Sequence, residues 1–154
     1  MRLTDTLKLQ NVKLPLAATN KTDAIRELID LLHASGDVTD SGKVLEAVLE
    51  REATRTTGIG YGLAIPHGRT AGAAGLTMAL GRCAGQIDFQ AIDGRPVSIV
   101  WLLVSPPDRS VAHIATLARI TRLMMIDRFR SDMNKAASAE DMLKLIATQE
   151  DQMG

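Results

Sequence analysis

A run of eight residues, 97–104, limits the folds open to this chain more than any other feature. It reads VSIVWLLV, and Ser98 is its only polar residue. A strand with one face in water alternates polar and apolar side chains, whereas a strand covered on both faces is apolar almost throughout. The run is far shorter than the roughly 20 residues that cross a bilayer. It therefore predicts the central strand of a sheet that carries helices on both faces.

Three other segments are expected to add strands to this sheet. Asn11–Leu16 alternates weakly, and its Pro15 favours an edge position because proline cannot donate to a sheet ladder. Residues 76–80 and 86–89 predict two separate strands, and Asp93-Gly94 predicts a turn before the central strand. Together these segments predict a mixed sheet.

Apolar residues at helical spacing predict four helices. Their expected extents are Thr22 or Asp23 to about Gly36, Asp40 or Ser41 to residues 50–52, Asp108 to about Ile126, and Ser138 or Ala139 to Thr148. With the strands, they predict an α/β (α+β) fold. We expect a single domain, residues 3–148, with a central mixed parallel and antiparallel sheet flanked by helices on both faces.

The composition narrows the possible classes of function. The 154 residues include 18 basic and 18 acidic side chains, so no net charge draws the chain toward nucleic acid or a membrane surface. Aromatic residues make up only 3% of the chain, which argues against a stacking platform for bases. The single cysteine, Cys83, excludes an internal disulfide. Since no signal peptide is recognisable, we expect a cytoplasmic protein without membrane insertion.

The stretch 55–70, RTTGIGYGLAIPHGRT, is the main candidate for a functional site. Three glycines stand at alternate positions, Gly58, Gly60 and Gly62. Such glycines mark a place where the chain turns tightly or lets another group approach its backbone. Pro66 ends the apolar run 63–65, because proline removes a backbone donor. His67 follows, with Gly68 behind it, so we expect a reactive imidazole presented at a strand end.

Several familiar sites are missing from the sequence. The dinucleotide pattern G-x-G-x-x-G fails because Leu63 stands where the third glycine belongs, and no P-loop pattern occurs. The G-x-S-x-G elbow of hydrolases is also absent. His67, His113 and Cys83 come from distant segments without a short-spaced pair, which argues against a metal site.

Two further residues are candidates for the same site as His67. On a helical wheel His113 lies at the border of the polar face, and the side expected to be buried comprises Val111, Ile114, Ala115 and Ala118. The row Leu117, Ile120 and Met124 either forms an exposed docking surface or, as we favour, packs on a neighbouring helix. Arg51 is either a solvated residue between two glutamates or a guanidinium near His67, where its planar fork would suit a phosphoryl group.

Two blocks of sequence carry a resemblance to a known family. The first joins Arg51-Glu52 to TGIGYGLAIPHGR, with Arg51 16 positions before His67. The second is IDFQAIDGRPVSIVWLLVSPPDRSVAHIATLARI, with His113 46 positions after His67. In this order they resemble the type-2 (fructose/mannitol-type) enzyme IIA domain of the bacterial phosphoenolpyruvate-dependent sugar phosphotransferase system. The first block looks closer to its nitrogen-regulatory branch. One small departure is Ile114, where many relatives have leucine.

The resemblance implies a phosphotransferase component with a covalent phosphohistidine intermediate and with neither metal nor organic cofactor. His67 would accept the phosphoryl group, as a tele-phosphohistidine, from the phosphocarrier protein HPr or its nitrogen-branch relative NPr. His113 would be the second active-site histidine, and Arg51 would help to hold the phosphoryl group. Backbone N–H groups around residues 58–62 are also expected to receive its charge.

Three functions follow from this resemblance. The phosphorylation state would control regulatory target proteins, which is the function we favour for a free-standing domain. Alternatively, the phosphate would pass to an enzyme IIB during uptake of fructose- or mannitol-type sugars. A third alternative is a protein that binds partners without being phosphorylated, although the presence of Arg51, His67 and His113 together argues against it.

Overall fold

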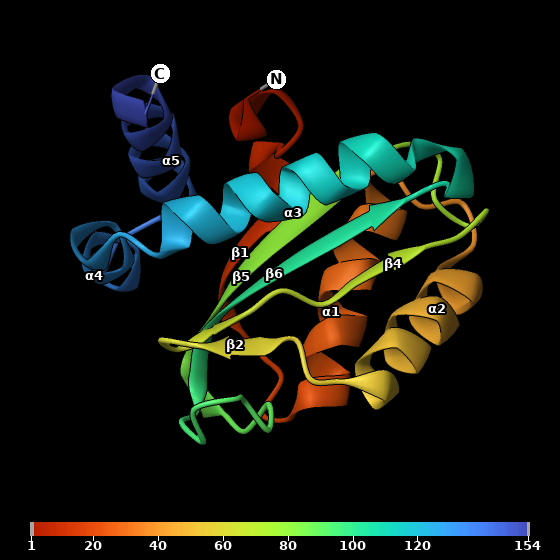
Figure 1. The fold of residues 1–154 in the computed structure, drawn as a ribbon, viewed down its shortest axis with the longest axis horizontal. Coiled ribbons are helices and arrows are strands. Elements are labelled where there is room, and N and C mark those ends of the chain that lie inside the picture. The colour runs from red at the N-terminus through yellow and green to blue at the C-terminus, as the bar shows by residue number, and fades with distance from the viewer. Residues whose placement is uncertain (1, 154) are drawn as a thin grey trace.

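The computed structural model describes residues 2–153, and a sheet of six strands lies at its centre (Figure 1). The strands are β1 (Val12–Leu16), β2 (Gly58–Gly60), β3 (Leu63–Ala64), β4 (His67–Arg69), β5 (Thr77–Ile87) and β6 (Val97–Ser105). They lie in the order β1-β5-β6-β3-β2, and β4 also pairs with β6. Strand β6 runs antiparallel to β5 and parallel to β3 and β4. The sheet is therefore mixed, as predicted, and β1 is an edge strand.

Within residues 2–153, five α-helices cover the two faces of the sheet. They are α1 (Lys21–Ala34), α2 (Ser41–Thr54), α3 (Ser110–Met124), α4 (Asp127–Lys135) and α5 (Ala139–Met153). Helices α1 and α2 lie on one side of the sheet and α3 on the other (Figure 1). Helices α1 and α2 share one apolar cluster with the sheet, and α3, α4 and α5 share another. No helix within residues 2–153 is long and apolar enough to cross a bilayer.

Strand β6 separates these two clusters. Val100, Leu102 and Val104 belong to the cluster beneath α1 and α2, and Ile99, Trp101 and Leu103 belong to the other. Each of the six is at most 1% exposed. Full burial of one such side chain contributes about 1.5–3 kcal/mol to stability. The apolar run of the sequence is therefore the central strand, covered on both faces as predicted.

Two predicted boundaries are wrong in the first half of the chain. Strand β5 is one strand, where the sequence predicts two at 76–80 and 86–89. It pairs with β6 on both sides of a register shift between Arg82 and Ile87, so backbone pairing carries it through a segment without an apolar pattern. Helix α1 is capped by Asn20, whose side chain accepts a hydrogen bond from Asp23 N, and not by Thr22 or Asp23. The cap of α2 is Asp40, as predicted.

The helices of the second half also differ from the prediction. A 3₁₀ turn, Pro107–Arg109, precedes α3, which begins at Ser110 instead of Asp108 and ends at Met124. Helix α4 was not predicted, because only Phe129 and Met133 of its nine residues are buried and two apolar positions make no visible stripe. Helix α5 continues to Met153 instead of ending at Thr148.

Candidate phosphoryl-transfer site

A pocket of about 410 Å³ opens between α2, β4 and α3. Its lining includes the three residues singled out in the sequence, Arg51, His67 and His113, together with Arg69 and Ile114. The ring centroids of the two histidines lie 5.6 Å apart. The fold thus brings residues from three distant segments of the chain to one place on the surface.

The short strand β4 places His67 in this pocket. It pairs in parallel with β6, with His67 opposite Leu103, and Pro66 O accepts a hydrogen bond from Leu103 N at 3.0 Å. Gly68 lets β4 lie close to α2 (Figure 1), because a Cβ at this position would be 3.2 Å from Val48 Cγ2 and 3.3 Å from Val48 N. This close packing brings His67 next to the helix that carries Arg51.

The backbone fixes the proton of His67. Its Nδ1 lies 2.9 Å from Ile65 O, and since a carbonyl oxygen only accepts, Nδ1 carries the proton and donates it. Burial is the main reason that the pKa of His67 is lowered, and Arg51 and Arg69 lower it further, against the opposing effects of the Ile65 bond and Glu52. The ring is therefore neutral at pH 7, and Nε2 keeps the lone pair of a nucleophile.

His113 is the buried histidine of the pair, with 3% of its surface exposed. Its Nδ1 lies 2.7 Å from Ser105 Oγ, and its Nε2 has no hydrogen-bond partner within residues 2–153. Burial lowers the pKa of His113 to about 4, and the neighbouring His67 and Arg69 act in the same direction. His113 is therefore also neutral at pH 7.

Two arginines bring positive charge to the pocket. Arg51 Nη1 donates a hydrogen bond to Arg55 O at 3.0 Å, which holds its guanidinium at the C-terminal end of α2. Arg51 makes no ion pair with its neighbours Glu50 or Glu52 in the described part of the chain. The structure places Arg51 in the same pocket as His67, and a role in holding a phosphoryl group stays a prediction.

Arg69 is the residue of the site that sequence reasoning missed. It lies two residues after His67 on β4, and its guanidinium donates a hydrogen bond to Ser110 Oγ at the start of α3. Residues i and i+2 of a strand lie on the same face. That periodicity is a signal that would have placed Arg69 beside His67.

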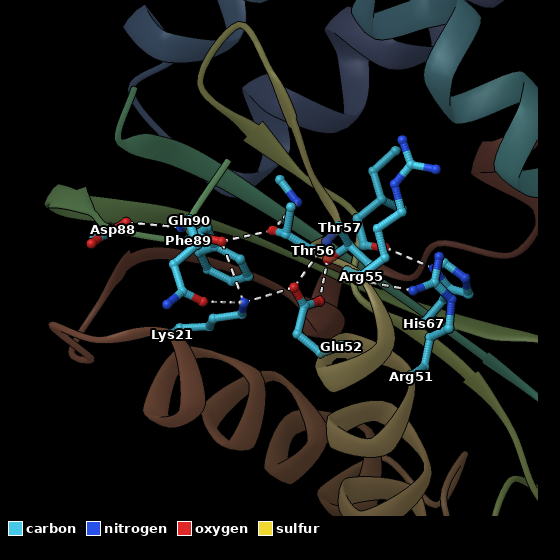
Figure 2. Close-up of polar contacts among 12 residues, drawn as sticks. Lys21, Arg51, Glu52, Arg55, Thr56, Thr57, His67, Asp88, Phe89 and Gln90 are labelled. Atoms are coloured by element: carbon cyan, nitrogen blue, oxygen red, sulfur yellow. Dashed lines mark hydrogen bonds and ion pairs between the residues drawn. The ribbon is translucent and has the colours of Figure 1, made fainter. Parts of the chain in front are cut away.

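A buried network supports the loop that follows α2 (Figure 2). Glu52 accepts a hydrogen bond from Thr57 N at 2.8 Å and forms an ion pair with Lys21 Nζ, also at 2.8 Å. Lys21 in addition donates to Phe89 O at 3.3 Å. The loop is thus tied to α1 and to the segment after β5, and Arg51 and His67 lie at the edge of this network (Figure 2).

The glycines at 58–62 are not among the residues that line the pocket, and the expectation that N–H groups around them receive a phosphoryl charge stays a prediction. A Cβ at Gly58 would lie 2.9 Å from Ala91, and Gly60 and Gly62 have positive φ angles of 100° and 77°. The glycines therefore form the tight turn between β2 and β3 and its close packing on the segment after β5. These requirements of the fold suffice to explain them.

Helix α3 is rotated relative to the prediction. Val111 and Ile114, expected to be buried, are 85% and 63% exposed. The buried residues of the helix are His113, Thr116, Ile120, Leu123 and Met124. The wheel is wrong because it treated His113 as a border residue, whereas the bond to Ser105 lets the imidazole lie on the buried face. Two residues of the row expected either to dock or to pack, Ile120 and Met124, accordingly lie in the core.

Cys83 lies away from the two histidines. It belongs to the apolar cluster beneath α1 and α2, and burial raises the pKa of its thiol to about 11. Within residues 2–153 no group of three His, Cys, Asp or Glu side chains is arranged to hold a metal ion.

Fold and pocket together define an α/β domain that gathers two histidines and two arginines around one surface hollow. Residues 5–149 match the family described as "Phosphoenolpyruvate-dependent sugar phosphotransferase system, EIIA 2". The chain therefore belongs to this family, whose members are phosphotransfer components, and the resemblance seen in its motifs is confirmed.

Relatives of this chain carry two kinds of name. A nitrogen regulatory protein of Bradyrhizobium diazoefficiens is 30% identical over 149 residues, which cover 96% of this chain and 95% of that protein. A fructose-specific EIIA component of Haloferax volcanii is 32% identical over 139 residues, 90% of either chain. The fructose-specific EIIABC component of Bacillus subtilis is 32% identical over 146 residues, but this chain spans only 23% of its length.

Solved structures share the fold. The nitrogen regulatory protein IIA-Ntr from Neisseria meningitidis superposes with a TM-score of 0.87 at 28% identity and covers 94% of this chain and 98% of its own. The mannitol enzyme IIA of Escherichia coli, solved in complex with phosphorylated mannitol enzyme IIB, has a TM-score of 0.79 at 20% identity, with coverage of 92% and 99%. At that identity the second structure shows the fold alone.

Proposed function

We propose that this protein is a phosphoryl carrier in which Nε2 of His67 accepts the phosphoryl group from a phosphohistidine of an HPr-type or NPr-type carrier protein. One observation carries the proposal: the hydrogen bond from His67 Nδ1 to Ile65 O leaves Nε2 as the only nucleophilic nitrogen of the ring. Two arginines, Arg51 and Arg69, line the same pocket. Membership of the family supports the same chemistry.

The transfer needs no proton to leave the attacking atom. The lone pair of His67 Nε2 forms a bond to phosphorus while the P–N bond of the donor breaks and its electron pair returns to the donor imidazole. The proton stays on Nδ1, which continues to donate its hydrogen bond to Ile65 O. While that proton is retained the phosphorylated ring is positively charged, and this makes His67 a good leaving group for the next transfer.

The charges of the pocket suit an incoming phosphoryl group. A phosphorylated side chain gains a charge of about −1.5 to −2 at neutral pH. Arg51 and Arg69 line the pocket together with a single acidic residue, Glu50. A guanidinium has a planar set of donors that matches phosphoryl oxygens, so in this proposal the two arginines stabilise the product and the transition state.

The rim of the pocket supports a protein as the donor. Val111 and Ile114 are exposed on α3, where Ile114 lines the pocket, and Ile92, 62% exposed, lines a second pocket that also includes His67. Exposed apolar residues around polar groups are typical of surfaces that bind another protein. A carrier protein docked there would bring its phosphohistidine to His67.

For the role in the cell we propose mainly regulation through the phosphorylation state. End-to-end similarity to a nitrogen regulatory protein, and to the solved IIA-Ntr, supports it. The alternative is a relay to an enzyme IIB for fructose- or mannitol-type sugars. The fructose-specific EIIA relative supports that alternative.

The test is to incubate the protein with phosphoenolpyruvate, enzyme I and either HPr or the nitrogen-type carrier, and to measure its intact mass. We expect one acid-labile phosphate that is absent in His67→Ala and present in His33→Ala, a control at an exposed histidine outside the pocket. The faster donor indicates the branch, and rapid loss of the phosphate to an added enzyme IIB would favour the sugar relay. No added mass with either donor would refute the phosphoryl carrier.

A further inference from the structure

The hydrogen bond between Ser105 and His113 determines what the buried histidine offers to the pocket. Ser105 is fully buried at the end of β6, and its Oγ lies 2.7 Å from His113 Nδ1. In a neutral imidazole one nitrogen carries a proton and the other a lone pair, and the bond made by one nitrogen fixes the state of the other. The direction of this single bond therefore decides whether Nε2 is a donor or an acceptor.

The two possible directions of this bond leave different groups of the ring without a partner. Ser105 Oγ has no other hydrogen-bond partner within residues 2–153, and His113 Nε2 has none at all. If Nδ1–H donated to Oγ, both the hydroxyl proton and the Nε2 lone pair would be buried without a partner. If the hydroxyl donates to Nδ1, Nε2–H and the lone pairs of Oγ are left instead. Only this second arrangement leaves a donor on the ring, and only a donor can bond to a phosphoryl oxygen that later enters the pocket.

We propose that Ser105 is a positioning residue that holds His113 in the Nε2–H tautomer, so that His113 donates a hydrogen bond to the phosphoryl group carried by His67. This inference rests on the proposed function of His67. Phosphoryl oxygens only accept hydrogen bonds, so the other tautomer would turn a lone pair toward them. The Nε2–H that has no partner in the free protein gains one when the phosphoryl group arrives.

The other groups around His113 fit a neutral donor better than a cation. His67 lies 5.6 Å away between ring centroids, and Arg51 and Arg69 line the same pocket. A protonated His113 would add a third positive charge beside the two guanidinium groups, with only Glu50 to offset it. A fixed tautomer supplies the donor without that charge.

The fold connects Ser105 to both histidines. Ser105 pairs with Arg69 in the β4–β6 ladder, and its carbonyl accepts a hydrogen bond from Thr70 N at 2.9 Å. The strand that carries His67 therefore also fixes the backbone of the residue that orients His113. A shift of β6 would move both rings together.

The first experiment reads the tautomer in the unphosphorylated protein, by long-range ¹H–¹⁵N NMR of the imidazole rings. We expect wild-type His113 as the Nε2–H form, and the same form in Ser105→Thr, which keeps the hydroxyl. Ser105→Ala should give a mixture of tautomers or the Nδ1–H form. Thr116→Ala is the matched control, because it removes a buried hydroxyl of α3 that bonds to Ala112 O and not to His113. Wild-type His113 in the Nδ1–H form, or an unchanged tautomer in Ser105→Ala, would overturn the inference.

The second experiment measures the rate of phosphoryl acceptance in the same variants. The loss of one hydrogen-bond donor predicts acceptance slower by about fivefold to tenfold in Ser105→Ala, with near wild-type rates in Ser105→Thr and Thr116→Ala. Equal rates in all variants would show that the tautomer has no effect on transfer and would overturn the inference as well. Failure of the proposed function is seen separately, as wild-type protein that accepts no phosphate at all.

Discussion

The two histidines of the pocket are held by different means. His67 lies on a strand of three residues, half-exposed, and its orienting partner is a carbonyl only two residues earlier in the chain. His113 is buried on α3, and its partner is a hydroxyl eight residues away on β6. The nucleophile is thus fixed by local backbone, and its neighbour by packing between elements. Substitution of His67 should therefore change phosphoryl acceptance but not stability, whereas substitution of His113 should change both.

The largest expected effect is the loss of phosphoryl acceptance in His67→Ala. The variant lacks the only nitrogen that can form the P–N bond, so its acceptance should fall to the background seen without a carrier protein. Its melting temperature should stay within about 2 °C of wild type, because a half-exposed side chain contributes little to the core. Intact mass and thermal unfolding measure the two properties. A strongly lowered melting temperature would show that the His67 side chain contributes to the core, contrary to its half-exposed position.

The next largest effect is expected in His113→Ala. Removal of a transition-state donor predicts acceptance slower by roughly 100-fold. Unlike His67→Ala, this variant should also lose about 2 kcal/mol in the free energy of unfolding, because it leaves a cavity beneath α3. Quenched-flow kinetics measure the rate of phosphoryl acceptance, and urea denaturation measures the free energy of unfolding. His113→Gln is the control that keeps a donor on a side chain of similar length, and it should recover part of the rate.

The contrast between the histidines also explains how much of the site could be predicted from sequence. The signals around His67 are local: Pro66, Gly68 and the spacing to Arg51 stand close together in the chain. The signals around His113 are not local, since nothing in the sequence of the helix indicates that Ser105 forms a hydrogen bond with the buried ring. The helical wheel counts histidine as a polar residue and therefore predicts the wrong buried face for the helix. Tertiary hydrogen bonds of this kind leave no periodic signal.

The same distinction holds for the fold. The central strand was predictable because burial on both faces requires a nearly continuous apolar run, and residues 97–104 have one. The continuous strand β5 was not, because backbone pairing with β6 maintains it through exposed residues 84–86. The sequence leaves two uses open for the glycines at 58–62, a tight turn or the approach of another group, and their tight turn and close packing suffice to explain them. A glycine cluster alone does not distinguish the two uses.

A pH series sharpens the comparison, because the pKa of the buried histidine is lowered further than that of His67. His113 has a pKa of about 4 in the folded protein against an ordinary value of 6.5. The unfolded chain therefore binds the extra proton first, so stability is fully present above pH 6.5 and falls as the pH drops toward 4. Between pH 7 and pH 5 the loss from His113 should be about 2 kcal/mol. Urea denaturation of wild type and His113→Gln at both pH values measures it.

The lowered pKa of His67 also makes stability fall as the pH drops, and this part of the pH dependence should remain in His113→Gln. A variant with the full wild-type dependence on pH would contradict the assignment of a buried neutral ring to His113. A variant with no dependence at all would show that the pKa of His67 is the same in the folded and the unfolded chain, and so would contradict the lowered pKa of that ring.

The smallest effect is expected at Gly68, where β4, the strand that carries His67, packs against α2. A Cβ at this position would lie 3.3 Å from the backbone nitrogen of Val48, which cannot move without shifting the helix. Gly68→Ala should therefore cost about 1 kcal/mol and should slow phosphoryl acceptance, because it moves β4 away from Arg51. Gly75→Ala is the matched control, since a Cβ there meets nothing within 4 Å. If both variants behave alike in denaturation and in transfer, close packing of β4 on α2 is not what positions His67.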